Sequence, residues 1–85
     1  MKYRKVYLDE IRISYEMKEL ILIFDIPRGE RNVELKTWRD LNKMNAKMIQ
    51  HSVWKHSDLS RLIEIATFIK KSGGSATILE ERLVF

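Results

Sequence analysis

The chain has 85 residues, of which 45% are hydrophobic and 33% charged, so it has the composition of one small globular domain and is too short for two cores. Its 16 Lys and Arg residues outnumber its 12 Asp and Glu residues, and the net charge of +4 weakly favours acidic partners. The absence of cysteine excludes disulfide, thiolate and cysteine-ligated metal chemistry. The longest apolar run is far below the ~18 residues of a membrane span, and no apolar block follows the basic start as in a signal peptide. We therefore expect a cytoplasmic protein with no membrane segment.

The first nineteen residues are expected to form an N-terminal extension to a domain over residues 20–85. Apolar residues around Ile11, Ile13 and Tyr15 alternate as in a strand, although a spacing of four also fits one face of a helix. We favour the strand, because Ile and Tyr are frequent in strands.

A continuous apolar run from Leu20 to Phe24 is typical of a strand buried on both faces, and a turn sequence follows it. Asp25 is then a lone carboxylate at the carboxyl end of an apolar strand. In α/β sheets, ligands and metals are often found at that location. An equally good interpretation is that Asp25 caps the turn ahead of Pro27.

Residues 30–45 have the pattern of an amphipathic helix. Leu35, Trp38 and Leu41 recur at a spacing of three among charged residues, which predicts that they form the buried face. Trp38 at this spacing is more typical of a core residue than of a platform for base stacking.

Five cations lie on or just before this helix: Arg28, Arg31, Lys36, Arg39 and Lys43. Lys36 and Asp40 stand four residues apart, so part of this group is expected to form surface ion pairs. Arg28 and Arg31 are the closest to Asp25 in the sequence, and we consider them candidates for contact with a phosphate backbone.

From Ala46 to His56, two short apolar pairs flank a polar triplet. This pattern predicts one bent strand or two short strands. A second basic group surrounds it, formed by Lys47, His51, Lys55 and His56. The spacing of the two histidines matches no standard metal motif.

The second predicted helix begins at Ser57, its expected N-cap, with Asp58 in the first turn. It ends at Lys70-Lys71 and Gly73-Gly74, since cations and a left-handed glycine suit a helix C-terminus. Its expected buried residues are Leu59, Leu62, Ile63, Ala66 and Ile69. Ile65 and Phe68 lie beside that stripe and indicate a deeper core or a partner surface. Residues 76–85 then form one strand or two, with any break near the charged triplet that starts at Glu80.

From residue 20 onward the predicted order is strand, helix, strand pair, helix, strand. This order predicts an α+β fold, a ferredoxin-like βαββαβ sandwich with an antiparallel sheet. A chain this short buries a small share of its surface, and we therefore expect a homodimer.

Two segments resemble the CRISPR-associated Cas-two family and its relatives, the VapD-type ribonucleases and the C-terminal domain of the PaaX repressors. The first is Phe24-Asp25-Ile26-Pro27 with Arg28 and Arg31 behind it. The second is Gln50-His51-Ser52-Val53-Trp54, which is similar to the family's Gln-x-Ser-Val-aromatic segment. The length and order of the remaining elements complete the resemblance over residues 20–85.

The resemblance implies a ferredoxin-like homodimer whose C-terminal strand crosses to the partner. In the family the aspartate that ends the first strand pairs across the dimer and is the proposed magnesium ligand for phosphodiester cleavage, and that position is Asp25 here. The family's serine helps to order the site and corresponds to Ser52. These two residues are the candidate catalytic residues. The candidates for nucleic-acid contact are Arg28, Arg31, Lys47 and Lys55.

The function implied is a dimeric nucleic-acid-binding adaptor in CRISPR spacer acquisition, which holds DNA or RNA beside a CRISPR integrase, with magnesium-dependent endonuclease activity as a further expectation. The turn after Asp25 lacks the second acidic residue of many members, which favours the adaptor over cleavage. Nineteen residues are too few for the winged-helix domain of a complete PaaX repressor. The alternatives are a free-standing, toxin-like VapD-type endoribonuclease and a protein-interaction domain that has lost the site.

Overall fold

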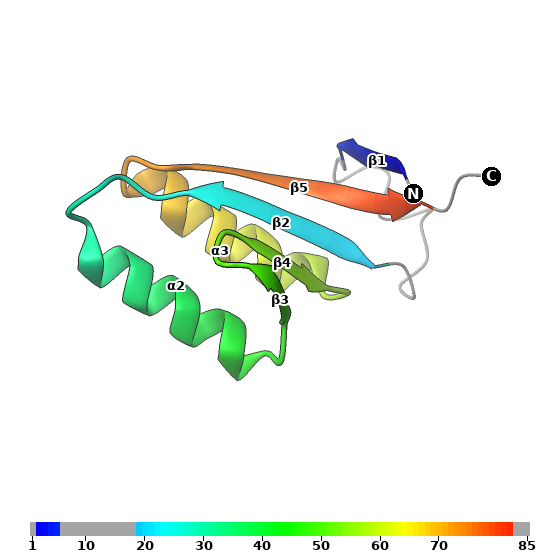
Figure 1. Cartoon of the computed structure of the whole chain (residues 1–85), viewed down its shortest axis with the longest axis horizontal. Helices are drawn as coiled ribbons and strands as arrows, with labels where there is room; N and C mark the ends of the chain where they lie inside the picture. Colours follow the sequence, from blue (N-terminus) through cyan, green and yellow to red (C-terminus); the bar gives the residue numbers. More distant parts are fainter. Residues whose placement is uncertain (1, 6–18, 83–85) are drawn as a thin grey trace.

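The computed structural model describes residues 2–5 and 19–82 of the chain, and its strands form one antiparallel sheet. The elements are β1 (Lys2–Lys5), β2 (Leu20–Asp25), α2 (Arg31–Lys43), β3 (Lys47–Gln50), β4 (Val53–His56), α3 (Leu59–Lys71) and β5 (Ser75–Arg82). The sheet order is β1-β5-β2-β4-β3, and both helices contribute to one hydrophobic core with the sheet (Figure 1). From β2 to β5 this is the predicted ferredoxin-like βαββαβ arrangement of the α+β class.

Strand β2 lies between β5 and β4 and carries the centre of the core. Leu20, Ile21 and Leu22 are buried, but Ile23 is 39% exposed. The predicted burial on both faces therefore stops at Leu22. Side chains alternate along a strand, so Leu20, Leu22 and Phe24 face the core cluster that the helices cover, whereas Ile23 lies on the other face of the sheet.

Helix α2 confirms the predicted amphipathic segment but corrects its buried face. The buried residues are Val33, Thr37, Leu41 and Met44. Leu35 and Trp38, expected in the core, are 44% and 53% exposed. Three residues are less than one turn of 3.6 residues, so a strict spacing of three moves around the helix, whereas the observed spacing of four, four and three stays on one face.

Helix α3 begins one residue later than predicted. Asp58, and not Ser57, is the N-cap, because its Oδ1 accepts a hydrogen bond of 3.2 Å from the backbone N–H of Arg61. Ile65 is buried, which confirms the deeper core at that position, while Phe68 is half-buried and packs against the core. The helix ends at Lys71, and Gly73 has the expected left-handed backbone with a φ of +94°.

Strands β3 and β4 are the two short strands of the prediction, and a bulge disturbs their register between Met48 and Gln50. Strand β5 runs without a break to Arg82. Residues 2–5 of the expected extension join the sheet, since β1 pairs with β5. The predicted strand around Ile11 and the chain end at 83–85 lie outside the described residues. In the part of the chain that is described, no helix is long and apolar enough to cross a membrane.

Candidate nucleic-acid interface

Asp25 and Ser52 are distant in the sequence but lie together at one end of the sheet. Asp25 is the exposed last residue of β2, and Ser52 is in the turn between β3 and β4. The backbone N–H of Phe24 donates a 3.0 Å hydrogen bond to the carbonyl oxygen of Ser52. This bond extends the pairing of β2 beyond Val53, the first residue of β4, and holds the turn between β3 and β4 next to Asp25.

The residues around Asp25 and Ser52 line a small pocket of about 190 Å³ with both polar and apolar walls. Its lining residues are Phe24, Asp25, Ile26, Glu34, His51 and Ser52. Glu34 was not a predicted site residue. It lies in the first turn of α2, and the loop after β2 brings that turn back toward the strand end. The sequence does contain a signal for Glu34, because it is a carboxylate in the first turn of the helix that follows Asp25.

An apolar groove, here named the Trp38 groove, adjoins this pocket and also has a volume of about 190 Å³. Its lining residues are Phe24, Ile26, Glu34, Leu35, Trp38, His51 and Trp54. Phe24, Ile26, Glu34 and His51 line both spaces, so the two form a continuous depression between α2 and the turn of the β3-β4 hairpin. The interpretation of Trp38 as a core residue is therefore wrong, because its indole lines an accessible groove.

Trp54, in contrast to Trp38, is a core residue with 2% of its surface exposed. Its indole N–H donates a 2.9 Å hydrogen bond to the carbonyl oxygen of His51. The buried ring thereby fixes the turn that forms one wall of the groove.

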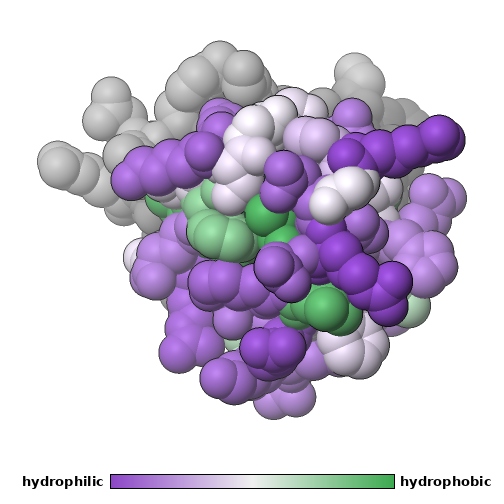
Figure 2. Space-filling model, turned by 90° about the vertical axis from the view of Figure 1, so that its left-hand side faces the viewer, coloured by the Kyte–Doolittle hydropathy of each residue, from purple (hydrophilic) through white to green (hydrophobic). Residues whose placement is uncertain are grey.

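Two arginines follow Asp25 as predicted. Arg28 is in the loop after β2, Arg31 is the first residue of α2, and both are exposed. Neither guanidinium group forms an ion pair or a side-chain hydrogen bond with any residue in the described ranges. Figure 2 faces the end of the molecule that carries the loop between β2 and α2, and its surface is hydrophilic around small hydrophobic areas. These two charges are therefore available to an anionic ligand.

The other two predicted contacts, Lys47 and Lys55, form a separate group. They face each other across β3 and β4, and Lys55 also pairs with Ile21, four residues before Asp25 on β2. Lys47 is exposed, whereas Lys55 is half-buried. The structure thus brings together Asp25, Ser52 and the start of α2, but it does not bring the two lysines to the same place.

Gly74 lies against the end of β2 at Asp25. A methyl group on its Cα would overlap the carbonyl oxygen of Asp25 and lie 2.8 Å from Cγ2 of Ile69. Its backbone N–H also donates a 2.9 Å hydrogen bond to the carbonyl oxygen of Ile69. Only a glycine allows the C-terminus of α3 to approach β2 this closely.

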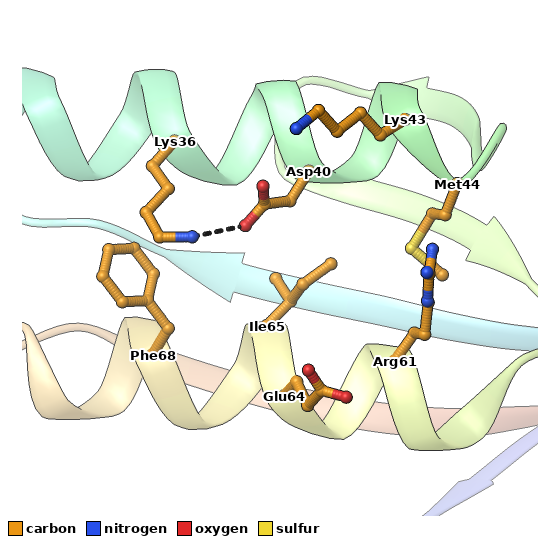
Figure 3. Close-up of a pocket in the computed structure, with 8 residues that line it drawn as sticks. All are labelled: Lys36, Asp40, Lys43, Met44, Arg61, Glu64, Ile65 and Phe68. Atoms are coloured by element: carbon orange, nitrogen blue, oxygen red, sulfur yellow. Dashed lines mark hydrogen bonds and ion pairs between the residues drawn. The ribbon is translucent and has the colours of Figure 1, made fainter.

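A second groove, of about 310 Å³, lies between the two helices (Figure 3). Lys36 Nζ donates a 2.7 Å hydrogen bond to Asp40 Oδ2, which confirms the predicted ion pair, and the same Nζ lies 4.9 Å from the centre of the Phe68 ring. Lys43 and Arg61 line the groove at its other end, together with Glu64. Three cations and two carboxylates line this groove, whereas two carboxylates, Asp25 and Glu34, line the pocket at the end of β2, where the cations Arg28 and Arg31 lie in the segment that follows Asp25.

The described residues of one chain do not form a complete magnesium site. Over residues 2–5 and 19–82, no three His, Asp or Glu side chains are placed to hold a metal together. Magnesium usually takes more than one carboxylate, and Asp25 and Glu34 are the two that line this pocket. A complete magnesium site at Asp25 needs ligands in addition to those that the described residues of one chain provide.

Comparison of the chain with known protein families, with curated proteins and with solved structures finds no match.

Proposed function

We propose that the protein is a homodimeric, nucleic-acid-binding adaptor of the Cas-two type, with a CRISPR integrase as its partner. The observation that carries the proposal is the meeting of Asp25 and Ser52 in one pocket, with Arg28 and Arg31 in the segment that follows. These four residues were selected from two separate segments of the sequence, and the fold unites the two segments at one end. The positive net charge of the chain also supports an acidic partner.

Binding is favoured over cleavage by the chemistry of the pocket. The family's proposed reaction uses magnesium, and over the described residues Asp25 and Glu34 are not joined by a third His, Asp or Glu ligand. A dimeric adaptor needs exposed cations and a defined shape, both of which the Asp25 end supplies.

The second candidate is a free-standing endoribonuclease of the VapD type. The observation in its favour is that His51 and Glu34 line the same pocket as Asp25. Imidazole and carboxylate groups are the usual general acids and bases. Incubation of the protein with labelled RNA tests this candidate, and cleavage that is lost in Asp25→Asn would replace the adaptor by the nuclease.

The adaptor proposal predicts salt-dependent binding of a DNA or RNA duplex. Each neutralised phosphate releases counterions and contributes about −0.9 to the slope of log affinity against log salt concentration. The double variant Arg28→Ala with Arg31→Ala should lower the affinity and make that slope less steep by about two units. Fluorescence anisotropy of a labelled duplex at several salt concentrations measures both quantities.

The matched control is the double variant Lys43→Ala with Arg61→Ala, which removes the same charge from the groove between the helices. Lys43 lies twelve residues after Arg31 on α2, which is roughly 18 Å along the helix axis. The control should retain most of the affinity. Equal losses in both double variants would show that only net charge matters, and the absence of binding in the wild type would remove the proposal.

A further inference from the structure

The Trp38 groove has the features of a site for one planar ring. Trp38 is 53% exposed although it is a large aromatic residue on a helix of a small domain. Any of the nucleobases can stack on an exposed indole ring, because every base has a π face. The groove also has aliphatic and aromatic walls, formed by Leu35 and Phe24.

We propose that the Trp38 groove binds an unpaired base of a single-stranded DNA or RNA segment. This inference rests on the proposed function, since it names the form of nucleic acid that the Asp25 end takes. A duplex hides the faces of its bases in the stack, so only a single strand or a frayed end can place a base against Trp38.

The volume of the groove limits its occupant. At about 190 Å³ the Trp38 groove is smaller than the roughly 300–1,000 Å³ of sites for drug-sized ligands. It therefore has room for one flat ring system.

Polar groups at the rim give the base edge partners for hydrogen bonds. Glu34 lines both the Trp38 groove and the adjoining pocket, and its carboxylate is an acceptor for an N–H group on a base edge, the amino group of cytosine or adenine or the N3–H of thymine. His51, on the opposite wall, provides ring nitrogens. These groups favour a nucleobase over an aliphatic side chain, which could not use them.

The charges around the groove determine which part of the strand enters. Glu34 repels phosphate, so the backbone of the strand stays outside while an uncharged base enters. Arg31 lies four residues before Leu35 and seven before Trp38, which places its side chain on the same flank of α2. Arg31 and Arg28, which have no acidic partner among the described residues, can then hold the phosphates next to the bound base.

An apolar peptide is the competing occupant, and Arg28 and Arg31, which have no acidic partner over residues 2–5 and 19–82, argue against it. A surface that binds apolar peptides gains little from cations at its edge, whereas a phosphate backbone requires them.

The test compares two oligonucleotides with the same number of phosphates, oligothymidine and an abasic strand of equal length. The wild type should bind oligothymidine about tenfold more tightly than the abasic strand, because only the former can stack. Trp38→Ala should remove this preference and leave the affinity for a duplex within about twofold, while Trp38→Phe should keep part of it. Because Trp38 lies outside the core, both variants should fold, which circular dichroism checks.

Fluorescence provides a second, independent readout. Oligothymidine should quench the emission of the exposed Trp38 more strongly than that of Trp54, which also lines the groove but is 2% exposed. In Trp38→Phe, where Trp54 is the sole tryptophan, most of the quenching should therefore be lost.

The outcomes separate this inference from the proposed function. Duplex binding without any preference for oligothymidine over the abasic strand would overturn the inference and leave the adaptor intact. If neither strand nor duplex binds, both proposals fall. A Trp38→Ala variant that binds oligothymidine normally but self-associates less would show that the groove is a protein contact, and this too would overturn the inference.

Discussion

Thr37 is a polar residue in the core, with 1% of its surface exposed. Its hydroxyl group has no hydrogen-bond partner within the described part of the chain. A buried polar group without a partner costs about 1–3 kcal/mol, because the hydroxyl loses its bonds to water without replacing them. The unsatisfied hydroxyl group of Thr37 therefore lowers the free energy of unfolding.

Thr37→Val should raise the free energy of unfolding by about 1 kcal/mol, because valine keeps the branched shape and removes the unsatisfied hydroxyl. Urea denaturation followed by circular dichroism measures the change. The control is Thr67→Val on the exposed side of α3, which should change stability by less than about 0.5 kcal/mol. A loss of stability in Thr37→Val would show that the hydroxyl has a partner, for example a bound water.

Thr37 also explains why the buried face of α2 was predicted incorrectly from the sequence. Threonine is not counted as an apolar residue, so Val33 and Leu41 were not recognised as members of one helix face. The spacing of three between Leu35, Trp38 and Leu41 was more regular and was chosen in its place. Asp25 and Ser52 could be selected because each lies at the edge of a recognisable segment, and the structure places them in one pocket, while their roles stay predictions. Glu34 was missed because its place in that pocket depends on how the first turn of α2 lies relative to the end of β2.

At the scale of the elements, the approach of α3 to β2 depends on Gly74. Gly74→Ala should lower the free energy of unfolding by about 1–3 kcal/mol, because the new methyl group meets a backbone carbonyl oxygen that cannot move independently. Thermal denaturation monitored by circular dichroism gives the change.

Gly29→Ala is the matched control for this prediction. Gly29 has a φ of +90°, but nothing lies within 4 Å of the position that its Cβ would occupy. Its substitution should cost about 1 kcal/mol from the backbone alone. Equal losses at both positions would show that the close contact at Gly74 relaxes freely.

The elements themselves were largely predictable from local signals. Runs of apolar residues, a capping aspartate next to the predicted position, and Gly73 at the helix end fixed the order and approximate bounds from β2 to β5. The Trp38 groove was not predictable, because it arises between a helix flank and a hairpin turn whose relative position is determined by packing. A sequence pattern predicts the structure of a single element, whereas this groove depends on how two elements pack together.

At the scale of the whole molecule, the proposed homodimer predicts an effect of Asp25 on association. Two Asp25 carboxylates paired across a two-fold axis repel each other, by about 1 kcal/mol at a surface separation of about 4 Å. In the presence of EDTA, Asp25→Asn should therefore tighten the dimer by about fivefold. Magnesium should tighten the wild-type dimer and leave Asp25→Asn unaffected.

Sedimentation equilibrium at micromolar concentration measures these dimer constants. Glu64→Gln, on α3, removes the same charge without changing the Asp25 end and should leave the dimer constant unchanged. A wild type that remains monomeric in every condition would contradict the homodimer. A dimer that does not respond to Asp25→Asn would show that the two aspartates are not paired.

The pairing of β1 with β5 has a practical consequence for handling the molecule. Lys2 pairs with Arg82 at one end of β5, whereas Asp25 pairs with Ser75 at the other end. Seven residues of extended strand separate these positions, which is roughly 23 Å. A tether joined to the amino terminus would therefore hold the protein on a sensor surface by the end opposite Asp25, and would leave the face with Arg28 and Trp38 open to solution.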